Sequence, residues 1–181
     1  MSHQPDRRCG QTAEATELPC LGANLRRAAR FVSQLFETTA GWSGLRVTQF
    51  SVLQAIARTG TITHGALGTL LGLDQTTVSR SLAPLRRRRW VRDKYGKDRR
   101  ERHVTLTVEG RMEFDRAEKG WQRVQANLRR RYGVPEWDAI QRALTAIANT
   151  ALTAQGAEPA PDMRSLERLN GRKRTGARRR R

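Results

Sequence analysis

The sequence has few cysteines, no long apolar run and no apolar segment near residue 1 of the kind found in secretory signals. Only Cys9 and Cys20 carry thiols, and two cysteines do not make a disulfide framework. No stretch approaches the roughly 18 apolar residues that a membrane-spanning helix needs. Residues 1–18 are polar and lack the apolar core of a secretory signal. These absences predict a protein of the reducing cytoplasm that has no membrane partner.

The sequence also lacks the residue arrangements that are typical of enzymes. His3, His64 and His103 have neither metal-ligand spacing nor a cluster of partner residues. No phosphate-binding loop, no Ser/His/Asp arrangement and no paired-carboxylate site is recognisable. We therefore predict that the chain is not an enzyme and that it binds no cofactor and no metal.

Acidic residues are scarce relative to basic ones. The chain has 35 Lys and Arg against 17 Asp and Glu, a formal net charge of +18. Residues 164–181 hold nine basic residues and Glu167, which is +8 and leaves +10 for residues 1–163. The sequence pI of about 11.6 is typical of nucleic-acid-binding proteins. Because arginine runs also occur in nuclear localisation signals, a nuclear location stays open as an alternative.

Hydrophobic periodicity divides the chain into three parts. Residues 1–18 have no periodicity and are predicted to form a disordered arm. Residues 19–155 show the periodicity of an ordered domain. Residues 156–181 begin with glycine and prolines and are predicted to form a basic, disordered tail.

Six segments of the ordered part have apolar residues at steps of three and four, which predicts helices. The segments are residues 21–36, 50–57, 66–71, 78–85, 108–128 and 137–151. Thr48, Asp74 and Thr107 are suitable N-caps, and Gly72 ends the third helix. Pro84 lies inside the fourth helix, where it predicts a kink or an early end.

Two strands are expected between the fourth and the fifth helix. Residues 91–95 form the first, and residues 102–107 form the second, in which Val104 and Leu106 alternate with polar residues. Gly96 permits a tight turn between them. The order helix, turn, helix, hairpin is that of a winged helix-turn-helix. The predicted fold is therefore mainly α with a small β part (α+β).

The winged unit, about residues 48–107, presents two sets of polar side chains to DNA. In the fourth helix, which begins after its cap Asp74 and is the second helix of the helix-turn-helix, the side chains able to reach base edges in a major groove are Gln75, Thr76, Thr77, Ser79 and Arg80. In the hairpin, those suited to phosphates or a narrow minor groove are Lys97, Arg99, Arg100 and Arg102. Asp98 is expected to brace the wing arginines. Residues 86–89, all arginines, either form a solvated helix end or contact phosphates.

The long helices outside the winged unit carry more apolar surface than one winged unit can bury. They are the segments 21–36, 108–128 and 137–151. Packing on a second copy of the chain would cover them. The pattern therefore predicts a homodimer, and a two-fold dimer reads a pseudo-palindromic site on double-stranded DNA.

Three stretches of the sequence resemble a known family. They are VTQFSVLQAIARTGTITHGALGTLLGLDQTTVSRSLAPL, the wing KDRRERHVTLTVEGR and the flanking helices, and they cover about residues 20–155. Together they are similar to the MarR family of bacterial regulators. The resemblance implies a dimeric winged-helix repressor or activator with long dimerisation helices. It also implies control by a small-molecule effector, bound between the dimer-forming and DNA-reading parts, or by oxidation of a cysteine.

The chain departs from the family pattern in two places. A glycine commonly ends the recognition helix, whereas here the arginines of residues 86–89 lead directly into Trp90. The arginine-rich C-terminal tail is also outside the pattern.

Cys20 is the candidate redox residue, because it follows Pro19 at the start of the first helix, where a thiolate is favoured. A passive thiol is the alternative reading. Cys9, in the arm, would be the resolving thiol of such a switch. The four tryptophans are expected to serve packing, although Trp42 is also placed to line an effector pocket.

The sequence thus predicts a sequence-specific DNA-binding transcription regulator. The specific form is a dimeric repressor that a small-molecule effector or thiol oxidation releases from DNA. The alternative is a nucleoid-associated, architectural protein with little sequence preference, which the net charge of +18 favours.

Overall fold

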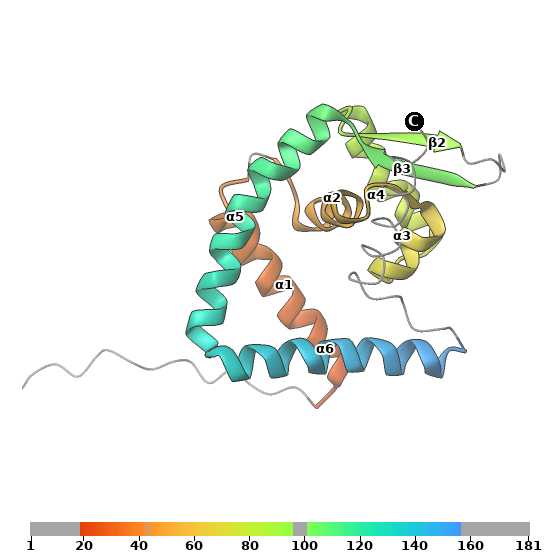
Figure 1. Ribbon diagram of the computed structural model, residues 1–181. Coiled ribbons are helices and arrows are strands. Elements are labelled where there is room, and N and C mark those ends of the chain that lie inside the picture. Colours follow the sequence, from red (N-terminus) through yellow and green to blue (C-terminus); the bar gives the residue numbers. More distant parts are fainter. Residues whose placement is uncertain (1–18, 43, 96–100, 157–181) are drawn as a thin grey trace, which may run out of the picture. The chain divides into compact units, whose positions relative to one another are not determined.

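The structure is a computed structural model that describes residues 19–42, 44–95 and 101–156 (Figure 1). The elements, in chain order, are α1 (Leu21–Thr39), α2 (Val47–Thr59), β1 (Ile62–Thr63), α3 (His64–Leu71), α4 (Gln75–Arg87), β2 (Val91–Tyr95), β3 (Arg102–Leu106), α5 (Val108–Tyr132) and α6 (Val134–Ala154). The chain divides into two units, with the boundary between Gln34 and Leu35 in α1. The predicted mainly helical fold with a winged helix-turn-helix is confirmed. None of the described helices is both long and apolar enough to cross a membrane.

The turn between α3 and α4 follows from two local signals. Gly72 adopts the left-handed conformation (φ 64°, ψ 37°) that suits glycine, and it ends α3. The side chain of Asp74 then accepts a hydrogen bond from the Thr77 N–H at 2.9 Å and begins α4. A Cβ on Gly68 would lie 2.6 Å from the Leu73 carbonyl oxygen and 3.3 Å from Val78 Cγ2, so α3 packs closely against the turn and the first part of α4. The predicted helix-turn-helix is therefore confirmed, including its caps.

The start of α2 differs from the prediction that Thr48 caps it. The N-cap is Arg46, whose backbone is extended (φ −88°, ψ 153°), and Val47 is the first helical residue. The side chain of Gln49 accepts from the Arg46 N–H at 3.2 Å, and that of Glu37 accepts from the Val47 N–H at 3.3 Å. These two acceptors satisfy donors at the helix start, so a threonine cap is not needed.

The sheet is antiparallel with the strand order β1-β3-β2. The predicted strands pair as a hairpin, and its register places Val91 opposite Leu106 and Tyr95 opposite Arg102. The strand β1 was not predicted, because two residues carry no periodicity of their own. It pairs Ile62 with Val104 and thereby attaches the start of α3 to the wing.

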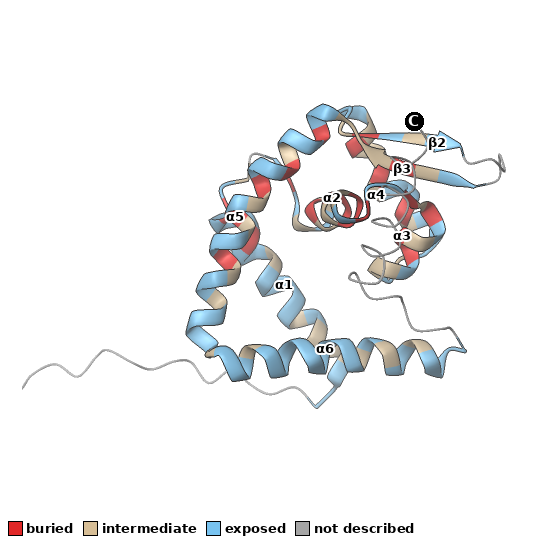
Figure 2. Ribbon diagram, in the orientation of Figure 1, coloured by how far each residue is buried: buried red, intermediate tan, exposed pale blue. Residues whose placement is uncertain are grey.

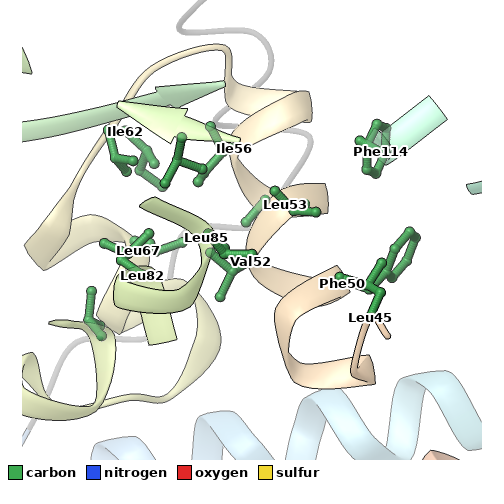
Figure 3. Close-up of a cluster of buried hydrophobic side chains, with 14 of the residues drawn as sticks. Leu45, Phe50, Val52, Leu53, Ile56, Ile62, Leu67, Leu82, Leu85 and Phe114 are labelled. Atoms are coloured by element: carbon green, nitrogen blue, oxygen red, sulfur yellow. The ribbon is translucent and has the colours of Figure 1, made fainter. Parts of the chain in front are cut away.

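The hydrophobic core lies between α2, α3, α4 and the sheet (Figure 3). Its fully buried large side chains are Phe50, Val52, Leu53, Ile56, Leu67, Val78, Leu82, Leu85 and Val104. Three of the buried residues, Val78, Leu82 and Leu85, are those that the helical spacing of α4 placed inward. The core thus fixes which face of α4 remains at the surface.

Helix α5 contacts its own chain through two glycines. A Cβ at Gly110 would lie 1.8 Å from the Trp90 carbonyl oxygen, and one at Gly120 would lie 2.0 Å from the Ala40 carbonyl oxygen. Any side chain at either position would therefore push α5 away from these backbones. Thr107 caps the helix, as predicted, by accepting from the Gly110 N–H at 3.0 Å.

The buried face of α5 differs in part from the predicted one. Val108 and Met112 were assigned to its apolar face but are 73% and 68% exposed. Phe114 and Ala117 are buried instead and join the core. The close approach at Gly110 turns this face inward, so the exposed apolar residues at the helix start face away from the core. One chain therefore buries part of this half of α5, through Phe114 and Ala117, and leaves the predicted apolar residues Val108 and Met112 exposed.

Helix α6 has no buried residue (Figure 2). Its apolar side chains include Ile140 and Leu144, which are 36% and 46% exposed. Near its start, the rings of Tyr132 and Trp137 lie 6.4 Å apart, centroid to centroid. The single chain thus leaves an apolar face of α6 open to solvent.

Candidate nucleic-acid interface

The recognition helix, α4, presents a polar face opposite its buried one. Gln75, Thr76, Ser79 and Arg80 are exposed. These are four of the five residues predicted to reach base edges, and none of them is needed for the core. Their side chains comprise an amide, two hydroxyls and a guanidinium, which are the groups that pair with base edges and phosphates.

The fifth predicted residue, Thr77, takes part in the helix cap. Its hydroxyl donates to Asp74 Oδ2 at 2.6 Å, while its N–H donates to Asp74 Oδ1. The same two hydrogen bonds, with the hydroxyl contributing more, hold the pKa of Asp74 below its usual value. The Thr77 side chain is therefore oriented by the cap and is half-buried, unlike its neighbours.

The helix α4 continues through Pro84 to Arg87, so the proline does not end it. Beyond it, the Arg89 N–H donates to the Arg86 carbonyl at 2.8 Å and the Trp90 N–H donates to the Leu85 carbonyl at 2.9 Å. This is the hydrogen-bond pattern of a Schellman motif. Arg89 occupies its left-handed position with φ 58°, and among the described residues it is the one non-glycine with positive φ. The family's usual glycine is thus replaced by a strained arginine.

The four arginines of residues 86–89 fall into two groups. Arg86 is half-buried and turns toward β2, whereas Arg87, Arg88 and Arg89 are exposed. The guanidinium of Arg88 lies over the Trp90 ring, 4.8 Å from its centroid. Arg86 is engaged with Asp93, whereas for the exposed Arg87, Arg88 and Arg89 the two alternatives, a solvated helix end or phosphate contact, both stay open.

Arg102 is an exposed basic residue of the wing that lies within the described residues. Its side chain is 51% exposed, and its Nη2 donates to Asp93 Oδ2 at 3.3 Å. Two further exposed basic residues of the wing, Arg92 and Lys94, lie on β2. The other predicted wing residues, Lys97, Asp98, Arg99 and Arg100, lie outside the described residues.

Sequence reasoning missed the residue that joins the wing to the helix-turn-helix. Asp93 Oδ1 accepts from Arg86 Nη2 at 2.9 Å and lies 3.1 Å from His64 Nε2. Burial would raise the pKa of Asp93, but the hydrogen bonds and charges of Arg86 and His64 outweigh it and lower this pKa. The sequence did contain a sign that Asp93 has a special role, since it is the only acidic residue among residues 75–97, which include eight basic ones.

The described part of the chain offers no metal site, because no three His, Cys, Asp or Glu side chains cluster in it. His64 is buried beside Asp93, and His103 lies 3.2 Å from Glu101 Oε2 at the wing surface. Cys20 directly precedes α1, as predicted, and is exposed. Cys9 lies outside the described residues.

The tryptophan at position 42 serves packing, which is one of its two predicted roles. Its Nε1 donates to the Ala117 carbonyl at 2.9 Å, and its ring stacks on Phe50 with centroids 4.8 Å apart. It links two hydrophobic clusters, one around Phe50 and one around Phe36. Its indole is thus already satisfied within the chain.

An open groove of about 540 Å³ lies at the base of the wing. Its lining is mostly apolar and consists of Arg92, Leu106, Thr107, Val108, Glu109, Arg111 and Met112. The exposed side chains of Val108 and Met112 form part of this surface. The groove therefore combines an apolar floor with two guanidinium groups and the carboxylate of Glu109, and Arg111 is also paired with Asp115 at 3.0 Å.

Comparisons with known proteins identify the same fold over most of the described chain. A sequence profile of the MarR family matches residues 43–101, which contain the helix-turn-helix and the wing strand β2. An uncharacterized HTH-type transcriptional regulator, YwoH of Bacillus subtilis (strain 168), is 28% identical over 91 residues. That match spans 50% of this chain and 66% of the relative.

Two solved structures extend the similarity. The M. tuberculosis transcriptional regulator MosR, in complex with DNA, is 32% identical with a TM-score of 0.68, covering 75% of this chain and 98% of that one. Bordetella bronchiseptica BpsR, solved to study how 6-hydroxynicotinic acid regulates its DNA binding, is 26% identical with a TM-score of 0.62. The match covers 71% of this chain and 93% of that chain. The winged helix with its exposed polar recognition face, together with these relatives, shows that the chain belongs to the MarR family and is a DNA-binding transcriptional regulator.

Proposed function

We propose that the protein is a sequence-specific repressor that binds a pseudo-palindromic operator as a homodimer. The observation that carries this proposal is the polar face of α4, where Gln75, Thr76, Ser79 and Arg80 are exposed together beside a basic wing. A relative of the same fold, MosR, was solved in complex with DNA. Charge alone would give affinity without sequence preference, whereas these side chains have the groups that read base edges.

The proposed homodimer is supported by the surface that one chain leaves open. Helix α6 buries no residue, and Ile140 and Leu144 on it are largely exposed. Exposed apolar faces of this length are costly in water unless a partner covers them. A second copy covers them symmetrically and sets two recognition helices at a fixed spacing. Sedimentation at micromolar concentration tests this, and a stable monomer would contradict it.

The proposed contacts are of two kinds, those that recognise base edges and those that bind the DNA backbone. Arg80 is the best base-reading candidate, because a bidentate arginine–guanine contact discriminates by about 1–3 kcal/mol. Lys97, Arg99, Arg100 and Arg102 are proposed to hold phosphates or enter the minor groove, with Asp98 as the brace of this wing.

The proposed release from DNA has two alternative triggers. A small-molecule effector is supported by the groove at the wing base, because its apolar floor suits a small organic ligand and its polar groups, Arg92, Arg111 and Glu109, can orient one. BpsR, a relative of the same fold, is regulated by 6-hydroxynicotinic acid. Thiol oxidation is supported by the exposed Cys20 at the start of α1. The two triggers are separated by experiment.

The decisive experiment begins with selection of binding sites from a random pool of duplexes. The enriched duplex, here called the operator, is then competed against random duplex at moderate salt. A specific regulator binds its operator more tightly than random duplex by a factor of about 10³ or more, and so stays bound to it in the competition. An architectural DNA-binding protein, which the charge of +18 favours as the second candidate, is stripped from every site by random duplex.

The trigger is tested on the protein–operator complex. Under the effector alternative, 6-hydroxynicotinate or a related aromatic acid releases the operator, and Met112→Glu at the groove abolishes that release. Under the thiol alternative, mild peroxide releases the operator from the parent and not from Cys20→Ser. Unchanged operator affinity with both reagents would contradict both triggers.

A further inference from the structure

Three polar side chains, each from a different element, meet at one carboxylate on a fourth element. Asp93 lies on β2, His64 is the first residue of α3, Arg86 lies in the last turn of α4, and Arg102 begins β3. Arg86 and His64 contact Asp93 Oδ1 at 2.9 and 3.1 Å, and Arg102 contacts Asp93 Oδ2 at 3.3 Å. Since a carboxylate only accepts, His64 Nε2 carries the hydrogen in its contact with Asp93.

The register of the sheet explains why these groups meet. Asp93 stands opposite Val104 on the neighbouring strand. Side chains two residues apart on a strand share a face, so Arg102 lies on the same face as Val104, diagonally across from Asp93. That face is the inner one, because Val104 is fully buried. The α3 and α4 side chains reach Asp93 from this side.

The four side chains become more exposed from the core outward. The exposed fractions are 8% for His64, 19% for Asp93, 29% for Arg86 and 51% for Arg102. The cluster therefore begins inside the helix-turn-helix and ends on the DNA-facing wing. It provides a continuous polar connection between the two parts that are proposed to touch DNA.

Asp93 is the only anion in this cluster. Without its charge, Arg86 and Arg102 would remain as two cations that face one another across the base of the wing. Arg86 would be the worse placed, because its Nε is already buried and has no hydrogen-bond partner among the described residues. A partly buried cation that loses its counter-charge is disfavoured, because its contact with the carboxylate no longer offsets the loss of water around it. The wing strands would relieve this by moving away from the end of α4.

We propose that Asp93 is a positioning residue that holds the wing at a fixed orientation to the recognition helix, and so sets the preference for the operator over other DNA. This inference rests on the proposed function. Two linked elements gain affinity together only where the geometry lets both engage at once. On the operator, α4 is held in register by base contacts, so the wing must already be aligned. On random duplex, neither element has a required register.

The size of the effect follows from population arithmetic. If the aligned wing falls to about one tenth of the molecules, operator affinity falls about tenfold. Random-duplex affinity does not fall, since it depends on the total positive charge, which increases by one when Asp93 is neutralised. Positioning and plain electrostatics therefore predict opposite signs for the change in operator affinity.

The test compares Asp93→Asn with a matched control, Glu101→Gln. Glu101 is an exposed acid directly before β3, the strand that pairs with β2, and its contact is with His103 and not with this cluster. Both substitutions remove one negative charge and nearly preserve size. Each full-length variant is titrated with the selected operator and with random duplex over a salt series, after its circular dichroism spectrum shows the parent fold.

We expect Asp93→Asn to bind the operator about tenfold more weakly, with unchanged or tighter binding to random duplex. Glu101→Gln should bind both duplexes equally or more tightly. If Asp93→Asn tightens operator binding as the control does, the proposal is overturned. If the parent itself shows no operator preference, the proposed sequence-specific function fails, and that outcome is separate.

A second variant keeps the inference testable if Asp93→Asn does not fold. Arg102→Gln changes the most exposed member of the cluster and leaves Asp93 its contacts with Arg86 and His64. A residue that only holds phosphate lowers operator and random-duplex affinity by the same factor. As part of the positioning cluster, Arg102→Gln lowers operator affinity by the larger factor. Equal factors for the two duplexes would refute the positioning role.

Discussion

The strained backbone of the arginine that ends the recognition helix allows a quantitative prediction about stability. Arg89 has φ 58° and sits at the left-handed position of the helix end, where its carbonyl accepts from the Thr107 hydroxyl at 2.6 Å. For an L-residue this conformation costs about 1–2 kcal/mol, whereas glycine adopts it without that penalty. The substitution Arg89→Gly therefore removes the strain.

Glycine also gives the unfolded chain more freedom, which offsets about 0.4–1 kcal/mol of the gain. We expect Arg89→Gly to raise the free energy of unfolding by roughly 0.5–1 kcal/mol. For a chain of 181 residues, a change of 1 kcal/mol corresponds to a melting temperature higher by about 2–4 °C.

The matched control is Arg89→Ala, which removes the same charge but keeps a Cβ. Any relief of repulsion among neighbouring arginines is common to both variants, whereas only glycine relieves the backbone strain. In urea unfolding, alanine should leave stability within about 0.5 kcal/mol of the parent. Equal stability of the glycine and alanine variants would refute the strain argument.

Three further predictions follow from the packing and the charges. Gly110→Ala places a Cβ against the Trp90 carbonyl and should lower the free energy of unfolding by about 1–3 kcal/mol or more, whereas Gly65→Ala, with open space around its Cβ, should raise it by about 0.5–1 kcal/mol in the same urea experiment. Because the folded-state pKa of Asp93 is lowered from 3.8, the stability that this carboxylate contributes is complete well above that pH and is lost as the pH falls through 3.8 and below. In urea unfolding, the free energy of unfolding of Asp93→Asn should therefore depend less on pH across this acid range than that of the parent. An equal pH dependence of the two proteins would contradict this. Truncation after Glu158 removes nine basic residues and should lower operator and random-duplex affinity by the same factor; loss of operator binding alone would show that the tail reads sequence or shape.

Features with a local cause were predictable from the sequence. The caps at Asp74 and Thr107 and the helix end at Gly72 depend only on residues within one turn, and all three are confirmed. The strand Val91–Tyr95 was predicted with its observed bounds. In the two caps and the helix end, neighbouring residues in the sequence are also the partners in space, and the strand was predictable from the alternation of its own residues.

Features that depend on distant partners were not predictable in this way. The start of α2 uses Glu37, ten residues before Val47, in place of a local cap. The inward face of α5 is set by contact between Gly110 and the backbone of Trp90, just before β2, which periodicity alone does not show.

The polar cluster is the clearest case among the site residues. Asp93 and His64 are 29 residues apart and meet only after the strands pair in register. A lone acid in a strongly basic segment is a usable warning of such a cluster, but it does not name the partners. Arg80 and the other exposed residues of α4 were predictable as surface residues because the buried face is periodic.

The most direct test of the central account is the base preference of Arg80→Ala. Sites are selected from a random duplex pool with the parent and with the variant in parallel. The account predicts a two-fold symmetric parent site with half-sites about 10–10.5 base pairs apart, or a multiple of this. It also predicts that Arg80→Ala loses preference at one position in each half-site and weakens operator binding by about 1–3 kcal/mol. An unchanged preferred site for Arg80→Ala, or no enriched site for the parent, would contradict the claim that α4 reads the DNA sequence.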